Sequence, residues 1–143
     1  MRARPFDQEV TVNIQPTKQQ VERLAASSDP DPVIMLNLLR FKKRADGIDA
    51  DDGISGAEAY ERYAAGVQSF LAGVGGRILL AAAPQESVIG PDPGEWDLVV
   101  TVEYPSRGAF LKMATDPDYL KVHAHREAAV ADSRLIACKS FPA

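Results

Sequence analysis

Apolar and polar residues alternate along the start of the segment from Glu95 to Ser133, which predicts a strand followed by a capped turn and a helix. One face of the predicted strand is apolar and consists of Trp96, Leu98, Val100, Val102 and Tyr104. The other face carries Asp97, Val99, Thr101 and Glu103. A period of two residues is typical of a strand with one buried face. The polar residues on the second face are the unusual feature of this strand.

Capping residues mark the helix that follows this strand. Ser106 can cap its start, and the triplet at 116–118, Asp-Pro-Asp, predicts that the helix breaks and begins again. Aspartate is a good cap, and proline suits the first helical position. We expect the helix to end at Asp132-Ser133 and a last strand to run from Arg134 to Phe141.

The remaining apolar pattern predicts two further helices and two further strands. A short amphipathic helix begins near residues 16–17, and an apolar stripe over 60–74 predicts a longer one. Residues 32–42 are apolar on both faces, as in a central strand that is covered from two sides. Residues 77–89 predict another strand, and Pro84 assigns it to a sheet edge because proline cannot donate a backbone hydrogen bond.

The segment from Arg44 to Gly56 is rich in aspartate, glycine and serine. Ile48 and Ile54 are the only residues of this segment that we expect to contribute to the core. This composition predicts a flexible surface loop between the first long strand and the longer helix.

The order of elements after the first helix, βαββαβ, predicts an α+β fold of the ferredoxin-like type. Four antiparallel strands would form one sheet with both helices on one face, and the first and third strands would be central. The open face would carry Met35, Leu39, Val99 and part of the second strand, and such a patch rarely stays exposed. We therefore expect a second copy to cover it, giving a homodimer with an α/β barrel. Residues 1–31 would be an N-terminal extension, and residues 32–143 the barrel domain.

Length and composition are those of one domain. The chain has 143 residues, 45% of them hydrophobic, and a net charge of −4. This charge argues against a protein that coats nucleic acid or an anionic membrane. The opening MRARPFDQEV has no apolar stretch behind its arginines, so we expect no secretory signal and a cytoplasmic location. The single cysteine, Cys138, excludes an intrachain disulfide and is expected to be buried.

Four segments together resemble an uncharacterised family of the dimeric α/β-barrel, ferredoxin-like superfamily. They are PVIMLNLLRFK, EWDLVVTVEYPSR, DPDYL and HREAAVADSRLI, and the resemblance covers about residues 32–141. The superfamily includes cofactor-free monooxygenases, lactone isomerases, haem-dependent peroxidases and ligand-sensing domains. The resemblance therefore implies a fold and a homodimer, and it leaves the function open.

A polar cluster on the open face is the first candidate site. If Ile34 faces the helices, Asn37 lies on the open face beside Asp97, Thr101 and Glu103. A few polar groups in an apolar cavity are typical of a small-molecule site. Asp97 or Glu103 would then act as a general base or bind the ligand by a hydrogen bond. The alternative is that these groups pair with one another or across the dimer interface.

The last helix and the tyrosines supply further candidates for ligand binding. Tyr119, His123 and Arg126 share one helix face, which is either a polar lid over the barrel or a solvated surface. Arg126 could also hold an anionic ligand in a bidentate grip. Tyr104, like Tyr60 and Tyr63, is either a core aromatic residue or orients a phenolic or quinone-like substrate through its hydroxyl.

We expect no metal, haem or nucleotide cofactor. His123 and His125 are two residues apart in a helix and point to nearly opposite sides, so they cannot easily share an ion. The glycines at 73, 75 and 76 follow a helix, unlike those of a phosphate-binding turn. RNA-recognition modules share this element order, but acids on the third strand would repel phosphate.

Two hypotheses about function remain open from the sequence. In the first, a homodimer binds a small, partly apolar metabolite and acts on it as a cofactor-independent isomerase or oxygenase. In the second, the protein is a noncatalytic binding or stress-associated dimer whose barrel is only an interface.

Overall fold

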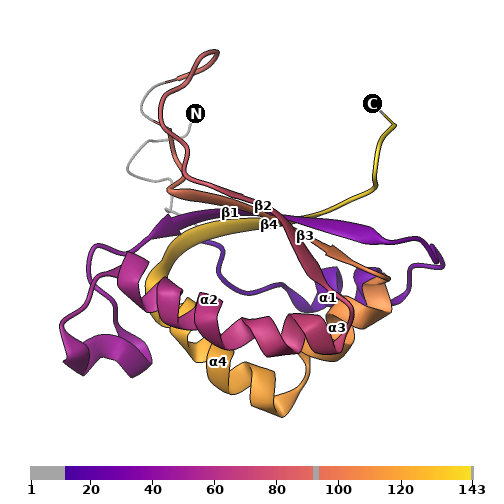
Figure 1. The fold of residues 1–143 in the computed structure, drawn as a ribbon, viewed down its shortest axis with the longest axis horizontal. Coiled ribbons are helices and arrows are strands. Elements are labelled where there is room, and N and C mark those ends of the chain that lie inside the picture. The colour runs from indigo at the N-terminus through magenta and orange to yellow at the C-terminus, as the bar shows by residue number, and fades with distance from the viewer. Residues whose placement is uncertain (1–11, 92–93, 143) are drawn as a thin grey trace.

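The computed structural model describes residues 12–91 and 94–142, which form one sheet with helices on one side (Figure 1). The elements in chain order are α1 (Lys18–Ala25), β1 (Val33–Phe41), η2 (Gly47–Asp52), α2 (Gly56–Gly73), β2 (Arg77–Ala82), β3 (Leu98–Tyr104), α3 (Arg107–Ala114), α4 (Pro117–Ala129) and β4 (Val130–Cys138). The predicted order βαββαβ and the short N-terminal helix are therefore confirmed.

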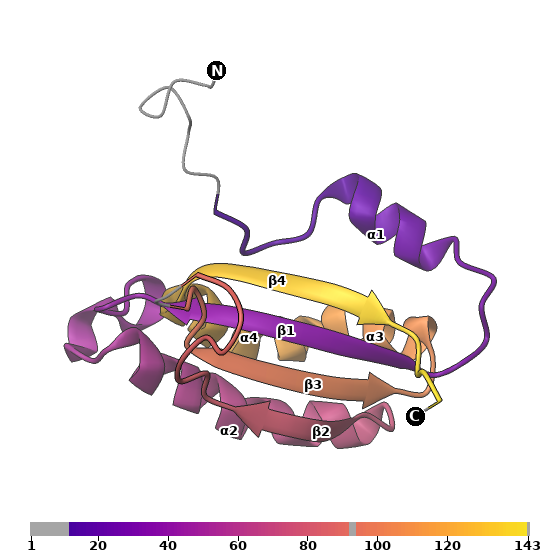
Figure 2. The ribbon, with the colours of Figure 1, turned by 90° about the horizontal axis from the view of Figure 1, so that it is seen from above.

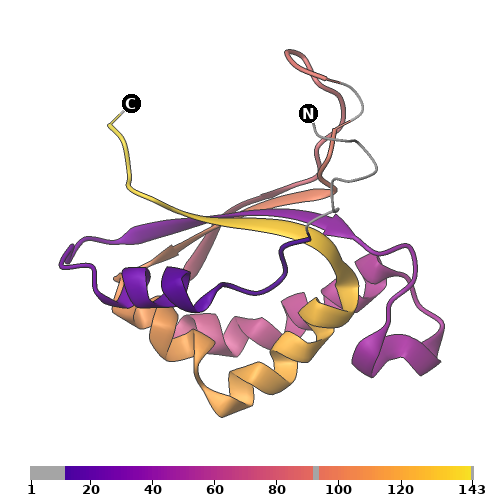
Figure 3. The same cartoon turned by 180° about the vertical axis from the view of Figure 1, so that it is seen from behind.

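All strand pairs are antiparallel, and the strand order is β2-β3-β1-β4. The first and third strands are central, as predicted. Figure 2 looks onto the open face of the sheet, with α2, α3 and α4 behind it and α1 beside β4. Figure 3 shows α1 on the helix side, next to α3. The sheet thus has one face under helices and one face without them.

The register of β1 reverses the predicted direction of its side chains. Met35 pairs with Val102 and Asn37 pairs with Val100, and both valines are buried beneath the helices. Directly opposed residues of neighbouring strands project to the same side. The predicted placement of Met35, Asn37 and Leu39 on the open face is therefore wrong. The reason is that β1 is apolar on both faces, so its pattern carries no signal for which side faces the helices.

Several predicted element boundaries differ from the structure. β4 begins at Val130 directly after α4, and the predicted helix end at 132–133 is too late. β2 ends at Ala82, before Pro84, and β3 begins at Leu98. A strand ends where its pairing with a neighbouring strand ends. An apolar run in the sequence can continue beyond that residue, so it does not mark the boundary.

The caps explain where the helices begin. The Ser106 hydroxyl accepts a hydrogen bond from the Ala109 amide, and the Asp116 carboxylate accepts one from the Asp118 amide. Pro117 occupies the first helical position, so the predicted break between α3 and α4 is confirmed. Thr17 and Ser55 form capping boxes at α1 and α2.

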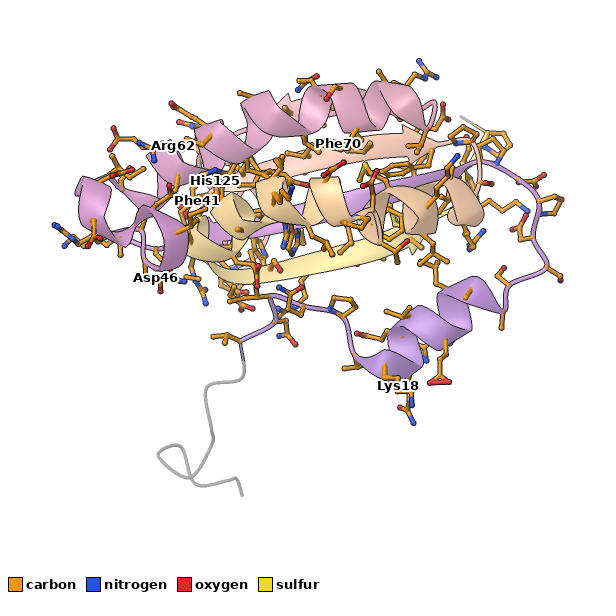
Figure 4. All side chains as sticks on the ribbon, turned by 90° about the horizontal axis from the view of Figure 1, so that it is seen from below. Lys18, Phe41, Asp46, Arg62, Phe70 and His125 are labelled. Atoms are coloured by element: carbon orange, nitrogen blue, oxygen red, sulfur yellow. The ribbon has the colours of Figure 1, made fainter. Side chains whose placement is uncertain are left out.

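Residues 44–56 are anchored to the helices, and the prediction of a flexible loop is wrong. Asp49 in η2 is only 1% exposed, and its carboxylate lies 2.7 Å from the Arg62 guanidinium and 2.9 Å from His125 Nδ1. Burial acts to raise the pKa of the Asp49 carboxyl, but hydrogen bonds from His125 and Arg62 outweigh burial and hold that pKa below its usual value. Figure 4 shows Arg62 and His125 close together beside η2. The partners of Asp49 are 13 and 76 residues away, beyond any local pattern.

Within the part of the chain that the structure describes, every helix is too short or too polar to cross a bilayer.

Gly56 provides a test of the close contact between α2 and the end of β1. A Cβ atom at Gly56 would lie 2.2 Å from the Lys42 carbonyl oxygen and 2.6 Å from the Ala129 carbonyl oxygen. We expect Gly56→Ala to lower the free energy of unfolding by about 3 kcal/mol, because backbone atoms must move to relieve the clash. Urea-induced unfolding measures this loss.

Gly73→Ala is the matched control, because a Cβ atom there meets nothing within 4 Å. An alanine at that helical position is expected to stabilise the protein by roughly 0.5–1 kcal/mol. Equal effects of the two substitutions would contradict the described packing.

Candidate functional site

A cavity of about 1260 Å³ lies on the helix side of the sheet. Its walls come from all four strands, mainly from their helix-facing side, from α2, α3 and α4, and from residues 13–27. Most of the wall is apolar, with Met35, Val67, Leu98, Val100 and Met113 among its residues. The cavity is therefore on the opposite side of the sheet from the predicted one.

Four of the predicted ligand-binding residues line this cavity: Asn37, Tyr104, His123 and Arg126. Asn37 reaches it from β1, Tyr104 from the end of β3, and the other two from α4. The Asn37 side-chain amide donates to the Val100 carbonyl at 3.3 Å and to the Met35 carbonyl at 3.4 Å. The sheet and α4 thus place these four residues in the wall of the same cavity.

A chain of hydrogen bonds crosses the cavity wall from α2 to the N-terminal segment. The hydroxyls of Tyr63 and Tyr119 are 2.9 Å apart, and the Tyr119 hydroxyl is 3.2 Å from His123 Nδ1. His123 Nε2 is in turn 3.3 Å from the side-chain oxygen of Gln15. The side-chain amide of Gln15 donates to Glu127 at 2.7 Å.

The part of the network formed by Tyr63, Tyr119 and His123 is composed of neutral groups. Burial lowers the pKa of His123, and the positive charge of Arg126 lowers it further. Burial also raises the pKa of the Tyr63 and Tyr119 hydroxyls. In the resting state the neutral imidazole and the protonated phenols hold no buried charge, and the imidazole can accept a proton to become an imidazolium.

The sequence does not predict this network as a site, although the spacing of its α4 residues predicts that they share one helix face. Tyr119, His123 and Arg126 do share a helix face, and the predicted alternative of a solvated surface is wrong. Tyr119 and Arg126 are each 6% exposed, because that face of α4 packs against α2 and residues 13–15. Tyr63 and Gln15 are 56 and 108 residues from their partners, so no local spacing identifies them.

Arg126 has an unusual environment for an arginine. Its guanidinium donates to the Ile14 carbonyl at 3.3 Å, and within residues 12–91 and 94–142 it forms no ion pair. A second set of contacts fixes the same segment, because Asp132 Oδ1 accepts from the Asn13 amide at 2.8 Å. Residues 13–15 are therefore attached to both α4 and β4.

The predicted acidic and hydroxyl residues do not join this site. The Asp97 carboxylate is exposed and accepts a hydrogen bond from the Phe41 amide at 2.9 Å, which extends the pairing of β1 with β3. Glu103 forms an ion pair with Arg77 at 2.9 Å, and Thr101 lies opposite Leu36 on the open face. The predicted cluster of Asn37 with Asp97, Thr101 and Glu103 is not formed. The catalytic roles of Asp97 and Glu103 stay predictions.

The two histidines face different surroundings, as their spacing predicts. His123 contacts the tyrosine network, whereas His125 contacts Asp49. Among the residues that the structure describes, there is no group of three or more His, Cys, Asp or Glu that is placed to hold a metal ion. Cys138 is half-buried at the end of β4, opposite Ile34, and not fully buried as expected.

Comparison with known proteins identifies a family and supports the fold. A family model described as a domain of unknown function, DUF1330, matches residues 51–139. No curated protein matches this sequence. The crystal structure of RPA0582, a protein of unknown function from Rhodopseudomonas palustris, is 38% identical, covers 93% of this chain and 100% of that chain, and has a TM-score of 0.85.

More distant structures share the fold alone. A dimeric protein of unknown function with a ferredoxin-like fold from Bacteroides fragilis is 10% identical, covers 76% of this chain and 96% of that chain, and has a TM-score of 0.50. The protein At3g17210 from Arabidopsis thaliana is 12% identical, covers 78% of this chain and 97% of that chain, and has a TM-score of 0.51. The predicted ferredoxin-like fold is confirmed.

The tyrosine network predicts different costs for two similar substitutions. Tyr119→Phe removes the hydroxyl that contacts both Tyr63 and His123. We expect it to lower the free energy of unfolding by about 1–3 kcal/mol, because two buried polar groups lose a partner. Urea-induced unfolding measures the change.

Tyr104→Phe is the control, since Tyr104 is 4% exposed and its hydroxyl has no hydrogen bond to any described residue. Removal of the Tyr104 hydroxyl is expected to change the free energy of unfolding by less than about 0.5 kcal/mol. A larger loss for Tyr104→Phe than for Tyr119→Phe would contradict the network.

Proposed function

This chain belongs to the DUF1330 family of proteins of unknown function, and we propose that it acts as a homodimer that binds a small, partly apolar metabolite. The helix-side cavity is the proposed binding site. Its volume supports this proposal, and so does its combination of a mainly apolar surface with polar side chains, because small-molecule sites combine the two.

The open face of the sheet supports the dimer. By register it presents Ile34, Leu36, Leu38, Val99, Leu80 and Ile136 on one surface. Every residue of β2 is exposed. Monomeric proteins rarely leave a contiguous apolar surface of this kind uncovered. A second copy of the same face is its proposed occupant, since two such faces are alike in their apolar composition.

Two projecting segments add to the argument for a second copy. The connection between β2 and β3 and the C-terminal tail both extend away from the sheet on its open side (Figure 1). Each carries exposed apolar residues, with Val88 and Ile89 on the connection and Phe141, 90% exposed, on the tail. Such side chains would be buried if the segments flank a second copy. The Bacteroides fragilis protein of the same fold is described as dimeric.

Proton transfer is the chemistry that the cavity's own residues supply. Neutral His123 can take up a proton from a ligand directly, or the Tyr119 hydroxyl can pass its own proton to His123 Nδ1 and accept the proton of the ligand. Either route leaves His123 as an imidazolium and the ligand as an anion. An isomerase would return this proton to another atom of the ligand, and a cofactor-independent oxygenase would let the ligand anion react with O2. Both activities occur in the superfamily that the chain resembles. Binding without turnover, in a noncatalytic dimer, is the alternative proposal and requires only the contacts of the cavity.

Leu80→Glu tests the interface. Leu80 is 52% exposed on the open face of a single chain. In the proposed dimer, a carboxylate at this position would be buried without a partner. We expect dimer dissociation to be at least about 30-fold more favourable, the effect of losing about 2 kcal/mol at an interface hot spot. Sedimentation equilibrium measures the dissociation constant.

The matched control is Ile48→Glu, which changes a similarly exposed residue, 59%, in η2 and away from the sheet. It should leave the dissociation constant unchanged. A wild-type protein that is monomeric would refute the dimer proposal, and so would equal effects of the two variants.

Native mass spectrometry of the purified protein tests the cavity. The expected species is a dimer with added small-molecule mass, and Ala64→Phe should retain less of that mass because Ala64 lines the cavity and the larger side chain narrows it. Ala72→Phe, an exposed position of α2 outside the cavity, should retain it.

Each contrary outcome of this measurement has a definite meaning. Added mass that persists in Ala64→Phe would show that the ligand binds elsewhere. A dimer without added mass in the wild-type protein would favour the noncatalytic dimer.

A further inference from the structure

Arg126 is the most buried arginine for which the structure gives contacts, and it has no counterion among the residues that the structure describes. Arg40, Arg62, Arg77, Arg107 and Arg134 each pair with a carboxylate, although their side chains are between 20% and 69% exposed. Arg126 is 6% exposed, and its contact among the described residues is the Ile14 carbonyl. A buried charge is costly unless it is paired, and an arginine cannot lose its proton.

The carboxylates nearest in sequence have other partners. Glu127 accepts from the Gln15 side chain at 2.7 Å. Asp132 accepts from the amides of Asn13 and Ser133 and pairs with Arg40 and Arg134. Within residues 12–91 and 94–142, the charge of Arg126 at the wall of the cavity is therefore uncompensated.

We infer that the metabolite bound in this cavity carries a carboxylate, and that Arg126 holds this group. A guanidinium binds a carboxylate through two parallel hydrogen bonds, which satisfies donors that the Ile14 carbonyl does not use. The inference rests on the proposed function, since it assigns a chemical class to the ligand of the same cavity.

Other groups of the cavity define the rest of this ligand. The Tyr104 hydroxyl is buried without a partner among the described residues and can donate to or accept from a second polar group. The positive charge of Arg126 acts to lower the pKa of the Tyr60, Tyr63 and Tyr119 hydroxyls, so the guanidinium lies near the aromatic part of the wall. An aromatic or aliphatic carboxylic acid with one further oxygen fits these groups.

A purely structural role for Arg126 is the competing explanation. In that case the side chain only braces the N-terminal segment through Ile14. One hydrogen bond of 3.3 Å uses one of five guanidinium donors, and it does not offset the desolvation cost of the buried charge. The two explanations differ in what they predict for ligand selectivity.

The test is isothermal titration calorimetry with 2-naphthoate and 2-naphthamide, two probes of the same shape that differ in charge. The wild-type protein is expected to bind the carboxylate at least about 10-fold more tightly than the amide, the lower end of what a charged hydrogen-bonded contact provides. Arg126→Met should bind both probes equally, with the affinity for the amide unchanged. Arg44→Met is the control, because Arg44 is exposed and outside the cavity, and it should keep the preference.

A second variant protects the test against a failure to fold. Arg126→Lys keeps the positive charge and should keep part of the preference for 2-naphthoate. Thermal unfolding without probe is expected to show Arg126→Met as stable as the wild-type protein, because an unpaired buried charge is removed. A less stable Arg126→Met that keeps the preference would establish the structural role and overturn the inference.

The outcomes for the wild-type protein separate the two proposals. Equal binding of both probes would overturn the carboxylate inference and leave the cavity as a binding site. Binding of neither probe would overturn the cavity as the proposed binding site, and the inference with it.

Discussion

The pairing of β1 with β3 and β4 is the constraint on which the other features of this molecule depend. β1 is hydrogen-bonded on both edges, and a shift by one residue would exchange the side chains of its two faces. In the observed register, Met35, Asn37 and Leu39 lie beneath the helices, and Ile34, Leu36 and Leu38 lie on the open face. One strand thus supplies both the floor of the cavity and the centre of the proposed interface.

The last helix connects these two surfaces. α4 passes directly into β4 at Val130, which lies at the end of the helix and has extended backbone angles. The side chains of His123 and Arg126 are therefore fixed relative to a strand that pairs with β1. A site built on such rigid elements holds its groups in place more accurately than a site on loops.

The sequence predicted features that depend on a residue and its near neighbours. Asp116 and Pro117 predicted the helix break, and Ser106 predicted a helix start, because a cap acts within a single turn. Features that depend on distant partners were not predicted. Asp49 appeared to belong to a polar loop, since His125 and Arg62 are not near it in sequence, and the direction of Asn37 could not follow from a strand that is apolar on both sides.

The residues of the site divide in the same way. Tyr104, His123 and Arg126 were identified because they are polar groups in apolar or helical surroundings, and that signal is local. That they line the same cavity depends on how α2 and α4 pack against the sheet. The spacing of residues in the sequence does not show this packing. Asp97 and Glu103 were given as catalytic candidates because they interrupt an apolar alternation, but their nearest partners are the Phe41 amide and Arg77.

The N-terminal segment forms one wall of the cavity, and it is attached by hydrogen bonds and by the partly buried side chains of Ile14 and Leu24. Residues 13–15 bind α4 and β4 through Asp132, His123, Glu127 and Arg126, whereas no residue of α1, Lys18–Ala25, is buried. A segment with little buried apolar surface detaches at a much lower free energy than the core unfolds. The passage of a molecule into the cavity can therefore be governed by an opening equilibrium of this wall, and amide hydrogen exchange there would report ligand residence separately from the stability of the sheet.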